Sequence, residues 1–163
     1  MKNKTLAAWL TFVCGPLGLH RFYLFGMGDW IGWLLPLPTA LGLYGLERVQ
    51  AHGLEDAWSW LLIPLLGFTV SGCALNAIVY GLMNAQSWNT RFNPLIDTEN
   101  AAGQTGWHTI GAIVASLLVG TTVLMSSIVF SFQHYFEFQI ELDSAKFPYA
   151  AIRNSSSGPS YRR

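Results

Sequence analysis

The segment from Ile110 to Phe132 contains neither a charged residue nor a proline, and nearly all of its side chains are apolar or small. An α-helix rises about 1.5 Å per residue, so about 20 residues are needed to cross the roughly 30 Å hydrocarbon layer of a bilayer. The segment is long enough for such a crossing. It predicts a transmembrane helix and constrains how the rest of the chain can fold.

Three further segments have a similar character. Trp58–Met83 is long and uncharged, Trp30–Leu46 is shorter and holds two prolines, and Thr5–Phe25 is uncharged until His20 and Arg21. Only 11% of the residues are charged and 52% are hydrophobic, whereas roughly 25% are charged in a typical soluble domain. We therefore predict an all-α membrane protein with about four transmembrane helices. The two prolines predict a broken or tilted helix in the second segment.

The distribution of Lys and Arg predicts the orientation of these helices. With four crossings, both termini and the loop after Leu46 share one side, and that side holds every Lys and Arg except Arg21 and Arg91. Because loops rich in Lys and Arg remain in the cytoplasm, both termini are predicted to be cytoplasmic. A three-crossing arrangement, in which the proline-containing segment re-enters, separates the positive charges less clearly.

The four segments group into two helical hairpins, at residues 2–48 and 57–147. The second hairpin includes a long polar loop, residues 84–106, which is predicted to lie outside the cytoplasm. Trp88 and Phe92 are too apolar for a free linker, so we expect this loop to form an ordered cap. Residues 148–163 include a Ser-rich run, and their composition predicts a disordered tail.

Several kinds of chemistry are not indicated. The net charge is zero and there is no basic run, so a nucleic-acid partner is not expected. His52, Glu55 and Asp56 lie close together in the chain, but their spacing matches no metal motif. Cys14 and Cys73 lie in apolar runs, where a free cysteine usually packs as a small hydrophobic residue. We expect no catalytic residues, no metal and no cofactor, and therefore not an enzyme.

The densest group of chemically capable residues follows the first apolar run. It combines a titratable ring, a permanent cation and two aromatic side chains, ahead of Asp29; its members are Gly18, His20, Arg21, Phe22, Tyr23 and Gly26. Charged groups near a membrane are costly unless they are paired, so this group is a candidate ligand site. Two structural interpretations are favoured over a ligand site: Arg21 pairs with Asp29 or with a lipid phosphate, and the aromatic rings lie at the interface.

The same residues carry a resemblance to a known family. The pattern begins with Lys4 and continues as Gly15-x-x-Gly18-x-His20-Arg21-Phe22-Tyr23-Leu24-x-Gly26, which resembles the signature of the TM-two domain. The resemblance covers about residues 2–48. It departs from the family pattern in the extra Phe25 before the final glycine, and in Glu47-Arg48 at the expected acidic position. The resemblance implies a helical hairpin in the inner membrane of a bacterium.

Small residues recur at intervals of four on the last apolar segment. Such residues let transmembrane helices approach closely and are typical of helix–helix interfaces. The candidate packing residues are Gly111, Ala112, Ala115, Ser116 and Gly120. They could pack the chain internally or bind another membrane subunit.

These patterns favour a non-catalytic, multi-pass protein of the bacterial inner membrane. We expect an accessory, assembly or structural subunit, surrounded by membrane lipids, that docks on a larger membrane protein complex or on copies of itself. The alternative is a small oligomeric channel or transporter, because broken helices at membrane depth often mark transport sites.

Overall fold

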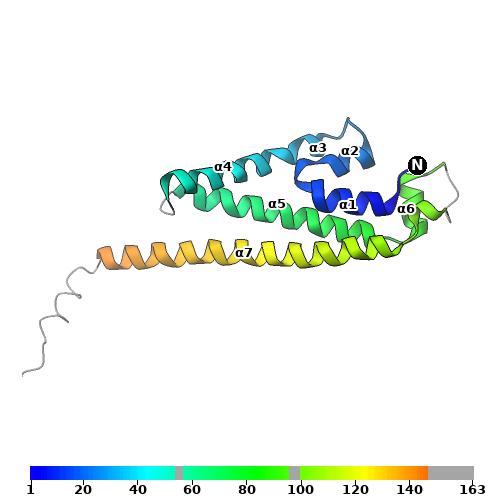
Figure 1. The fold of residues 1–163 in the computed structure, drawn as a ribbon. Coiled ribbons are helices and arrows are strands. Elements are labelled where there is room, and N and C mark those ends of the chain that lie inside the picture. The colour runs from blue at the N-terminus through cyan, green and yellow to red at the C-terminus, as the bar shows by residue number, and fades with distance from the viewer. Residues whose placement is uncertain (54–56, 96–99, 147–163) are drawn as a thin grey trace, which may run out of the picture.

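A computed structural model describes residues 1–53, 57–95 and 100–146, and these residues form helices and turns with no β-strand. The elements are α1 (Lys4–Cys14), η1 (Gly15–Leu17), α2 (Leu19–Phe25), α3 (Trp30–Leu34), α4 (Pro36–His52), α5 (Ala57–Leu82), α6 (Ala85–Phe92), η2 (Ala101–Gly103) and α7 (Trp107–Lys146). All-α architecture is thus confirmed. The helices form one elongated bundle around α5, against which α1, α4 and α7 pack (Figure 1). Helices α1 and α4, which come largely from the first predicted hairpin, thus pack on α5 of the second.

The predicted single helix over Thr5–Phe25 is wrong. The 3-10 turn η1 and a left-handed Gly18 reverse the chain, so α2 runs back along α1 (Figure 1). The start of α1 meets the end of α2, where the Asn3 backbone N–H donates to the Tyr23 hydroxyl over 2.8 Å. The hydropathy of an apolar segment indicates its length but not the direction of the chain, so it gives no sign of the reversal at Gly15–Gly18.

This reversal changes the predicted arrangement of the ends. The Lys2 backbone N–H donates to Asn93 Oδ1 over 2.7 Å, and Trp88 Nε1 donates to the Lys2 carbonyl oxygen over 3.0 Å. The N-terminus therefore lies against the loop 84–106 rather than on the opposite side from it, and α7 ends at the other end of the molecule (Figure 1). Within the described residues, the N-terminus and the end of α7 thus lie at opposite ends of the bundle, whereas four crossings would place both termini on one side.

The second predicted segment is almost continuous. Asp29 caps α3 by accepting the Gly32 backbone N–H over 3.1 Å, and α3 meets α4 at Leu35. Pro36 is the first residue of α4. In the first turn of a helix, a missing N–H removes no hydrogen bond. The proline pair thus restarts the helix instead of breaking it in its interior.

Two helices of the described chain are long and apolar enough to cross a membrane. They are Trp58–Leu82 in α5 and a segment, Ala101–Asp143, that contains most of α7. The two helices pack side by side over the length of α5, until Trp60 stacks on Phe130 with ring centroids 4.3 Å apart. At about 1.5 Å per residue, α7 is about 60 Å long and α5 about 39 Å. The C-terminal part of α7 consequently extends beyond the bundle (Figure 1).

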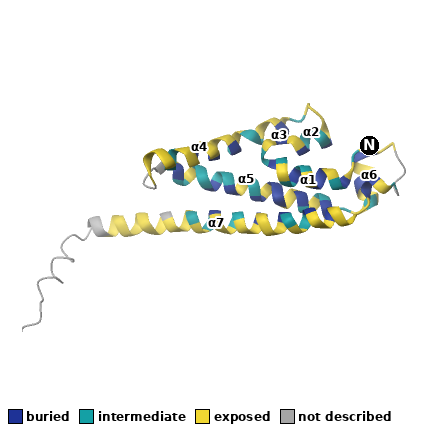
Figure 2. Ribbon diagram, in the orientation of Figure 1, coloured by how far each residue is buried: buried dark blue, intermediate teal, exposed yellow. Residues whose placement is uncertain are grey.

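Burial is distributed unusually over the helices. The most buried side chains include small or polar residues such as Thr11, Ser59, Thr109 and Ser116, whereas large apolar side chains such as Leu61 and Met125 are exposed. Figure 2 shows exposed residues along most of α4 and α7. The helices approach one another through small residues, because a Cβ atom added to Gly67 would lie 1.7 Å from Ser127 Oγ and one added to Gly42 would lie 2.3 Å from Leu66 Cβ.

Candidate functional site

The motif residues of the first apolar segment come together in the α1–α2 hairpin and its connection to α3. Gly18 has a φ of 75°, which favours glycine, and a Cβ atom there would lie 2.2 Å from the Gly32 carbonyl oxygen. Gly32 in turn faces Phe22, whose ring would lie 2.7 Å from a Cβ atom on Gly32. Gly26, with a φ of 86°, ends α2. The glycines of the motif therefore allow the chain to reverse and α3 to pack against it.

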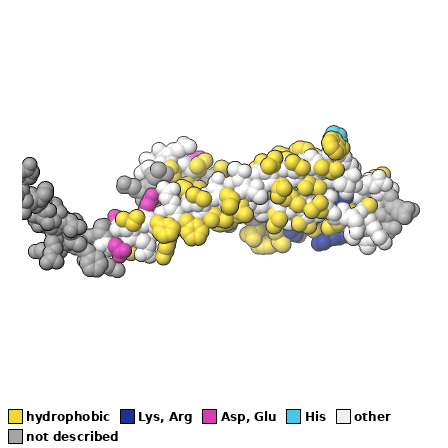
Figure 3. Space-filling model, turned by 90° about the horizontal axis from the view of Figure 1, so that it is seen from below, with side chains coloured by type: hydrophobic (Ala, Val, Ile, Leu, Met, Phe, Trp, Pro, Cys, Tyr) yellow, Lys and Arg dark blue, Asp and Glu magenta, His cyan; other side chains and the backbone are white. Residues whose placement is uncertain are grey.

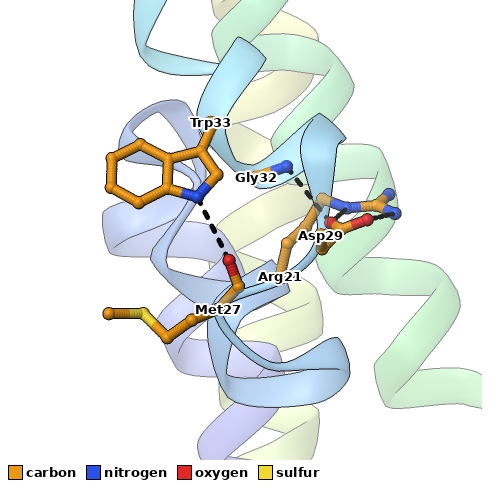
Figure 4. Close-up of polar contacts among 5 residues, drawn as sticks. All are labelled: Arg21, Met27, Asp29, Gly32 and Trp33. Carbon is orange, nitrogen blue, oxygen red and sulfur yellow. Dashed lines mark hydrogen bonds and ion pairs between the residues drawn. The ribbon is translucent and has the colours of Figure 1, made fainter.

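The charged residues of the motif close the next turn. Arg21 makes a bidentate ion pair with Asp29, and the same carboxylate accepts a hydrogen bond from the Gly32 backbone N–H (Figure 4). Of the interpretations drawn from the sequence, the pairing of Arg21 with Asp29 is the one the structure contains. The hydrogen bond from Arg21 lowers the pKa of Asp29 from its usual range, and Arg21 also lies over the Phe25 ring, 4.9 Å from its centroid.

The aromatic residues of the motif also have partners. Phe22 packs edge-on against Trp33, with ring centroids 5.2 Å apart. Trp33 Nε1 donates to the Met27 carbonyl oxygen over 3.1 Å, which fixes the turn between α2 and α3 (Figure 4). Tyr23 packs against the small core formed by Ala7, Leu24, Trp88 and Phe92. Phe22 and Tyr23 are therefore parts of the packing of the hairpin.

His20 differs from the other motif residues. Its side chain is only 2% exposed, and its Nδ1 atom has no hydrogen-bond partner among the described residues. Its ring faces Tyr80 of α5, with ring centroids 6.4 Å apart. A buried polar atom without a hydrogen-bond partner is costly. Packing alone therefore does not explain why the motif has a histidine at position 20.

Lys4, the first residue of α1, is a buried lysine that sequence reasoning did not identify as one. Its side chain is fully buried, and Nζ donates to the Met83 carbonyl oxygen over 2.8 Å and to Thr105 Oγ1 over 2.6 Å. Burial lowers the pKa of Lys4. This contact joins the start of α1, the end of α5 and the approach to α7. Its partners lie about 80 to 100 residues along the chain, so no local pattern could reveal it.

The predicted packing residues of α7 occupy different environments. Ala112, Ser116 and Gly120 are buried, Ala115 is half-buried and Gly111 is exposed. Ser71 of α5 donates to the Gly120 carbonyl oxygen over 3.2 Å, and a Cβ atom on Gly120 would lie 2.8 Å from Ala74 Cβ. The face that contains Ala112, Ser116 and Gly120 thus packs inside the chain, against α5.

A groove runs between α5 and α7 beside this contact. It has a volume of about 310 Å³ and is lined by residues that include Phe68, Gly72, Leu75, Ser116 and Leu124. Ser116 Oγ is buried and has no hydrogen-bond partner among the residues described. A Cβ atom on Gly72 would meet nothing within 4 Å, so the groove is open at that position.

Other candidate ligand groups remain apart. His52 ends α4, whereas Glu55 and Asp56 lie outside the described residues. Within residues 1–53, 57–95 and 100–146, no three His, Cys, Asp or Glu side chains are placed so that they could hold a metal ion. Cys14 and Cys73 are free thiols. The predicted tail, residues 148–163, also lies outside the described residues.

A comparison of the chain with protein-family models, curated proteins and solved structures gave no match. The resemblance of residues 2–48 to the TM-two domain therefore rests on the motif residues alone, and the geometry described above is the basis for any functional proposal.

Proposed function

We propose that the chain is a non-catalytic, integral protein of the bacterial inner membrane, which docks on a larger membrane protein complex or on copies of itself. In this proposal α3–α4, α5 and α7 cross the bilayer. The α1–α2 hairpin enters from one side and returns to it. Lys4 lies beside Met83 at the end of α5, and Gly15 lies beside Cys73, so the hairpin reaches about 15 Å along α5, or half of the roughly 30 Å hydrocarbon layer.

The surface of the bundle supports the membrane part of this proposal. Leu61 and Leu75 of α5 and Leu118 and Met125 of α7 are all more than 60% exposed, and apolar side chains extend along the face on which α7 lies (Figure 3). In water such a surface would be unfavourable. In lipid it needs no cover, and helices associate instead through small residues and polar contacts, as α5 and α7 do here.

In this arrangement the distribution of Lys and Arg does not predict which end of the protein faces the cytoplasm. Lys2, Lys4, Arg21 and Arg91 belong to the end of the molecule that holds the N-terminus and α6, and the remaining five Lys and Arg residues belong to α4, to the end of α7 or to the sequence after it. Four against five is too even to apply the positive-inside rule. The proposal therefore assigns three crossings of the bilayer. The charges favour neither end of the protein for the cytoplasmic side.

The single observation that carries the docking part is the projecting end of α7, residues 132–143. From Trp107, about 25 residues are enough to cross the hydrocarbon layer and reach the headgroups on the other side, yet the helix continues to Lys146. Large apolar side chains remain exposed on the projecting end: Phe132, Tyr135, Phe136, Phe138, Ile140 and Leu142. Lipid tails cannot cover side chains beyond the headgroups, so another protein surface is needed.

The test is the mass of the assembly extracted from native membranes. A tagged full-length chain is taken out with a membrane-solubilising polymer that retains lipid, and the mass of the protein in each particle is measured. We expect assemblies heavier than the 18.0 kDa monomer, with a constant ratio of the chain to any partner. Particles that hold a single copy and no other protein would contradict the proposal.

A small oligomeric channel or transporter is the second candidate. The reversal between α1 and α2 and the restart at Leu35 place helix ends within the bundle, and His20 is a buried polar side chain beside the reversal. Helices broken at membrane depth often line transport sites. Ion flux into liposomes that contain the purified chain, and loss of that flux in His20→Ala, would favour this function. Arg21 is less suitable for substitution because it also holds Asp29.

A further inference from the structure

Large apolar residues form a stripe along α7 on the side away from α5. The outer stripe consists of Val114, Leu118, Met125, Phe132, Tyr135 and Leu142, all of which are exposed. Their separations are three, four or seven residues. This is the heptad spacing of a coiled coil, in which Leu118, Met125 and Phe132 occupy one core position and Val114, Tyr135 and Leu142 the other. Thr121 and Ile128 also fall at the second core position.

Where α5 ends, the residue types change on the α5-facing side of α7 but much less on the outer side. The side that packs on α5 makes its last contacts through Ser127 and Phe130, and beyond that point it carries Glu137 and Glu141. The outer stripe, by contrast, continues into the projecting end with Phe132, Tyr135 and Leu142, and Gln139 interrupts it there. A helix that merely continued into water would not need an apolar stripe there. The pattern is that of a helix with a second contact surface.

We infer that the projecting end of α7 packs against the same segment of a second copy of this chain, as a parallel two-stranded coiled coil along the outer stripe. The inference rests on the proposed function, because it names one of the two partners that the proposal allows. Two copies inserted in one membrane with the same orientation present their α7 helices in parallel. Phe132, Tyr135 and Leu142 of the outer stripe then meet their own counterparts about a two-fold axis, as in most homodimers.

The charges agree with a second copy as the occupant. Glu137 and Glu141 fall at heptad positions on the outside of such a coiled coil, so like charges do not face one another across the contact. Gln139 is the polar residue within the stretch from Phe132 to Leu142 that takes a core position. A single polar core residue fixes the register and the number of strands in coiled coils.

Disulfide formation between single cysteines tests this inference in native membranes. In a full-length chain in which Cys14 and Cys73 are replaced by Ala, a cysteine is placed at Tyr135 or Leu142 on the outer stripe, or at Gln133 or Glu137 off it. A disulfide needs Cα atoms within about 7 Å. We expect disulfide-linked dimers from Tyr135→Cys and Leu142→Cys, with yields at least about tenfold higher than from Gln133→Cys and Glu137→Cys.

Equal yields at all four positions would show random collisions and overturn the inference. Bands that link the chain to a different protein, without dimers, would also overturn it, although the proposed docking function would stand. Single-copy particles in the extraction experiment, together with no cross-linked product, would remove both the inference and the proposed function.

A pair of matched substitutions gives a second measurement that does not depend on cysteine chemistry. Leu142→Asp places a charge on the outer stripe, and Ile140→Asp makes nearly the same chemical change two residues earlier, off the stripe. Both side chains are exposed in one copy, so neither substitution disturbs the fold of the monomer. We expect Leu142→Asp to lower the dimeric fraction of the extracted protein at least about tenfold in equilibrium constant, and Ile140→Asp to leave it nearly unchanged. An equal effect of the two substitutions would contradict the coiled coil.

Discussion

Gly18 and Gly32 lie so close that a Cβ atom on Gly18 would stand 2.2 Å from the Gly32 carbonyl oxygen. Gly18 also has a φ of 75°, a conformation that costs other residues roughly 1–2 kcal/mol. We therefore expect Gly18→Ala to destabilise the α1–α2 hairpin by about 2 kcal/mol or more. Thermal unfolding in detergent micelles measures this loss.

Gly28→Ala is the matched control for this change. Gly28 lies in the turn between α2 and α3, has no positive φ, and a Cβ atom there would meet nothing within 4 Å. Its substitution should leave the unfolding midpoint within a degree or two of the original. If both alanine variants behaved alike, the close approach of α2 and α3 at Gly18 would not exist in the protein.

The ion pair between Arg21 and Asp29 predicts a dependence of stability on pH. Because the pKa of Asp29 is lowered in the fold, its carboxylate stabilises the fold above the unfolded-state pKa of about 4, and this stabilisation is lost as the pH falls through the folded-state pKa. The unfolding midpoint should therefore drop on acidification below about pH 4. Asp29→Asn should have a lower midpoint at neutral pH and a smaller drop in acid, whereas Glu137→Gln, on the projecting end, should keep the original drop.

Gly67 and Ser127 predict a compensating pair of substitutions at the contact between α5 and α7. A Cβ atom on Gly67 would lie 1.7 Å from Ser127 Oγ, so Gly67→Ala should cost about 1–3 kcal/mol through overpacking. Adding Ser127→Gly removes the clashing atoms, and the double variant should be more stable than Gly67→Ala alone. Simple addition of the two single effects, measured by unfolding in micelles, would rule out a direct contact.

Ser116 and Ser71 face the same groove but should respond oppositely to alanine. Ser116 Oγ is buried and has no partner within the described part of the chain, so Ser116→Ala should be neutral or stabilising. Ser71 donates to the Gly120 carbonyl oxygen, so Ser71→Ala should cost about 1 kcal/mol. Equal losses in the two variants would mean that Ser116 has a partner in the protein.

Local features of the fold follow from sequence patterns, whereas the path of the chain does not. The long apolar segments predict the two helices that could cross a membrane, and the prolines near Leu35 predict a discontinuity in the second segment. A chain that reverses at Gly18 has the same composition as one that continues as a single helix, since most of Leu19–Phe25 is apolar. What decides between them is the packing of Gly15 on Cys73 and of Gly18 on Gly32, both contacts between residues distant in the sequence.

Some contacts of the candidate site can likewise be predicted from the sequence, and others cannot. The pairing of Arg21 with Asp29 could be anticipated because the two residues are eight apart and opposite in charge. The burial of Lys4 could not, because its acceptors come from Met83 and Thr105. Trp88 was recognisable only as too apolar for a linker; its full burial against the N-terminus depends on α6 folding back over Lys2. The periodicity of residues within one helix gives no information about such contacts between distant segments.

The closure of the N-terminus by residues from later in the chain has a consequence for how the protein is made. When α1 and α2 leave the ribosome, the acceptors of Lys4 and the side chains that hold Lys2 have not yet been synthesised. The first hairpin must therefore wait, with a lysine that has no permanent partner, until α5, α6 and the start of α7 emerge. These contacts of the first residues can form only after residues 83–105 have been made, so a chain halted after α4 cannot form them.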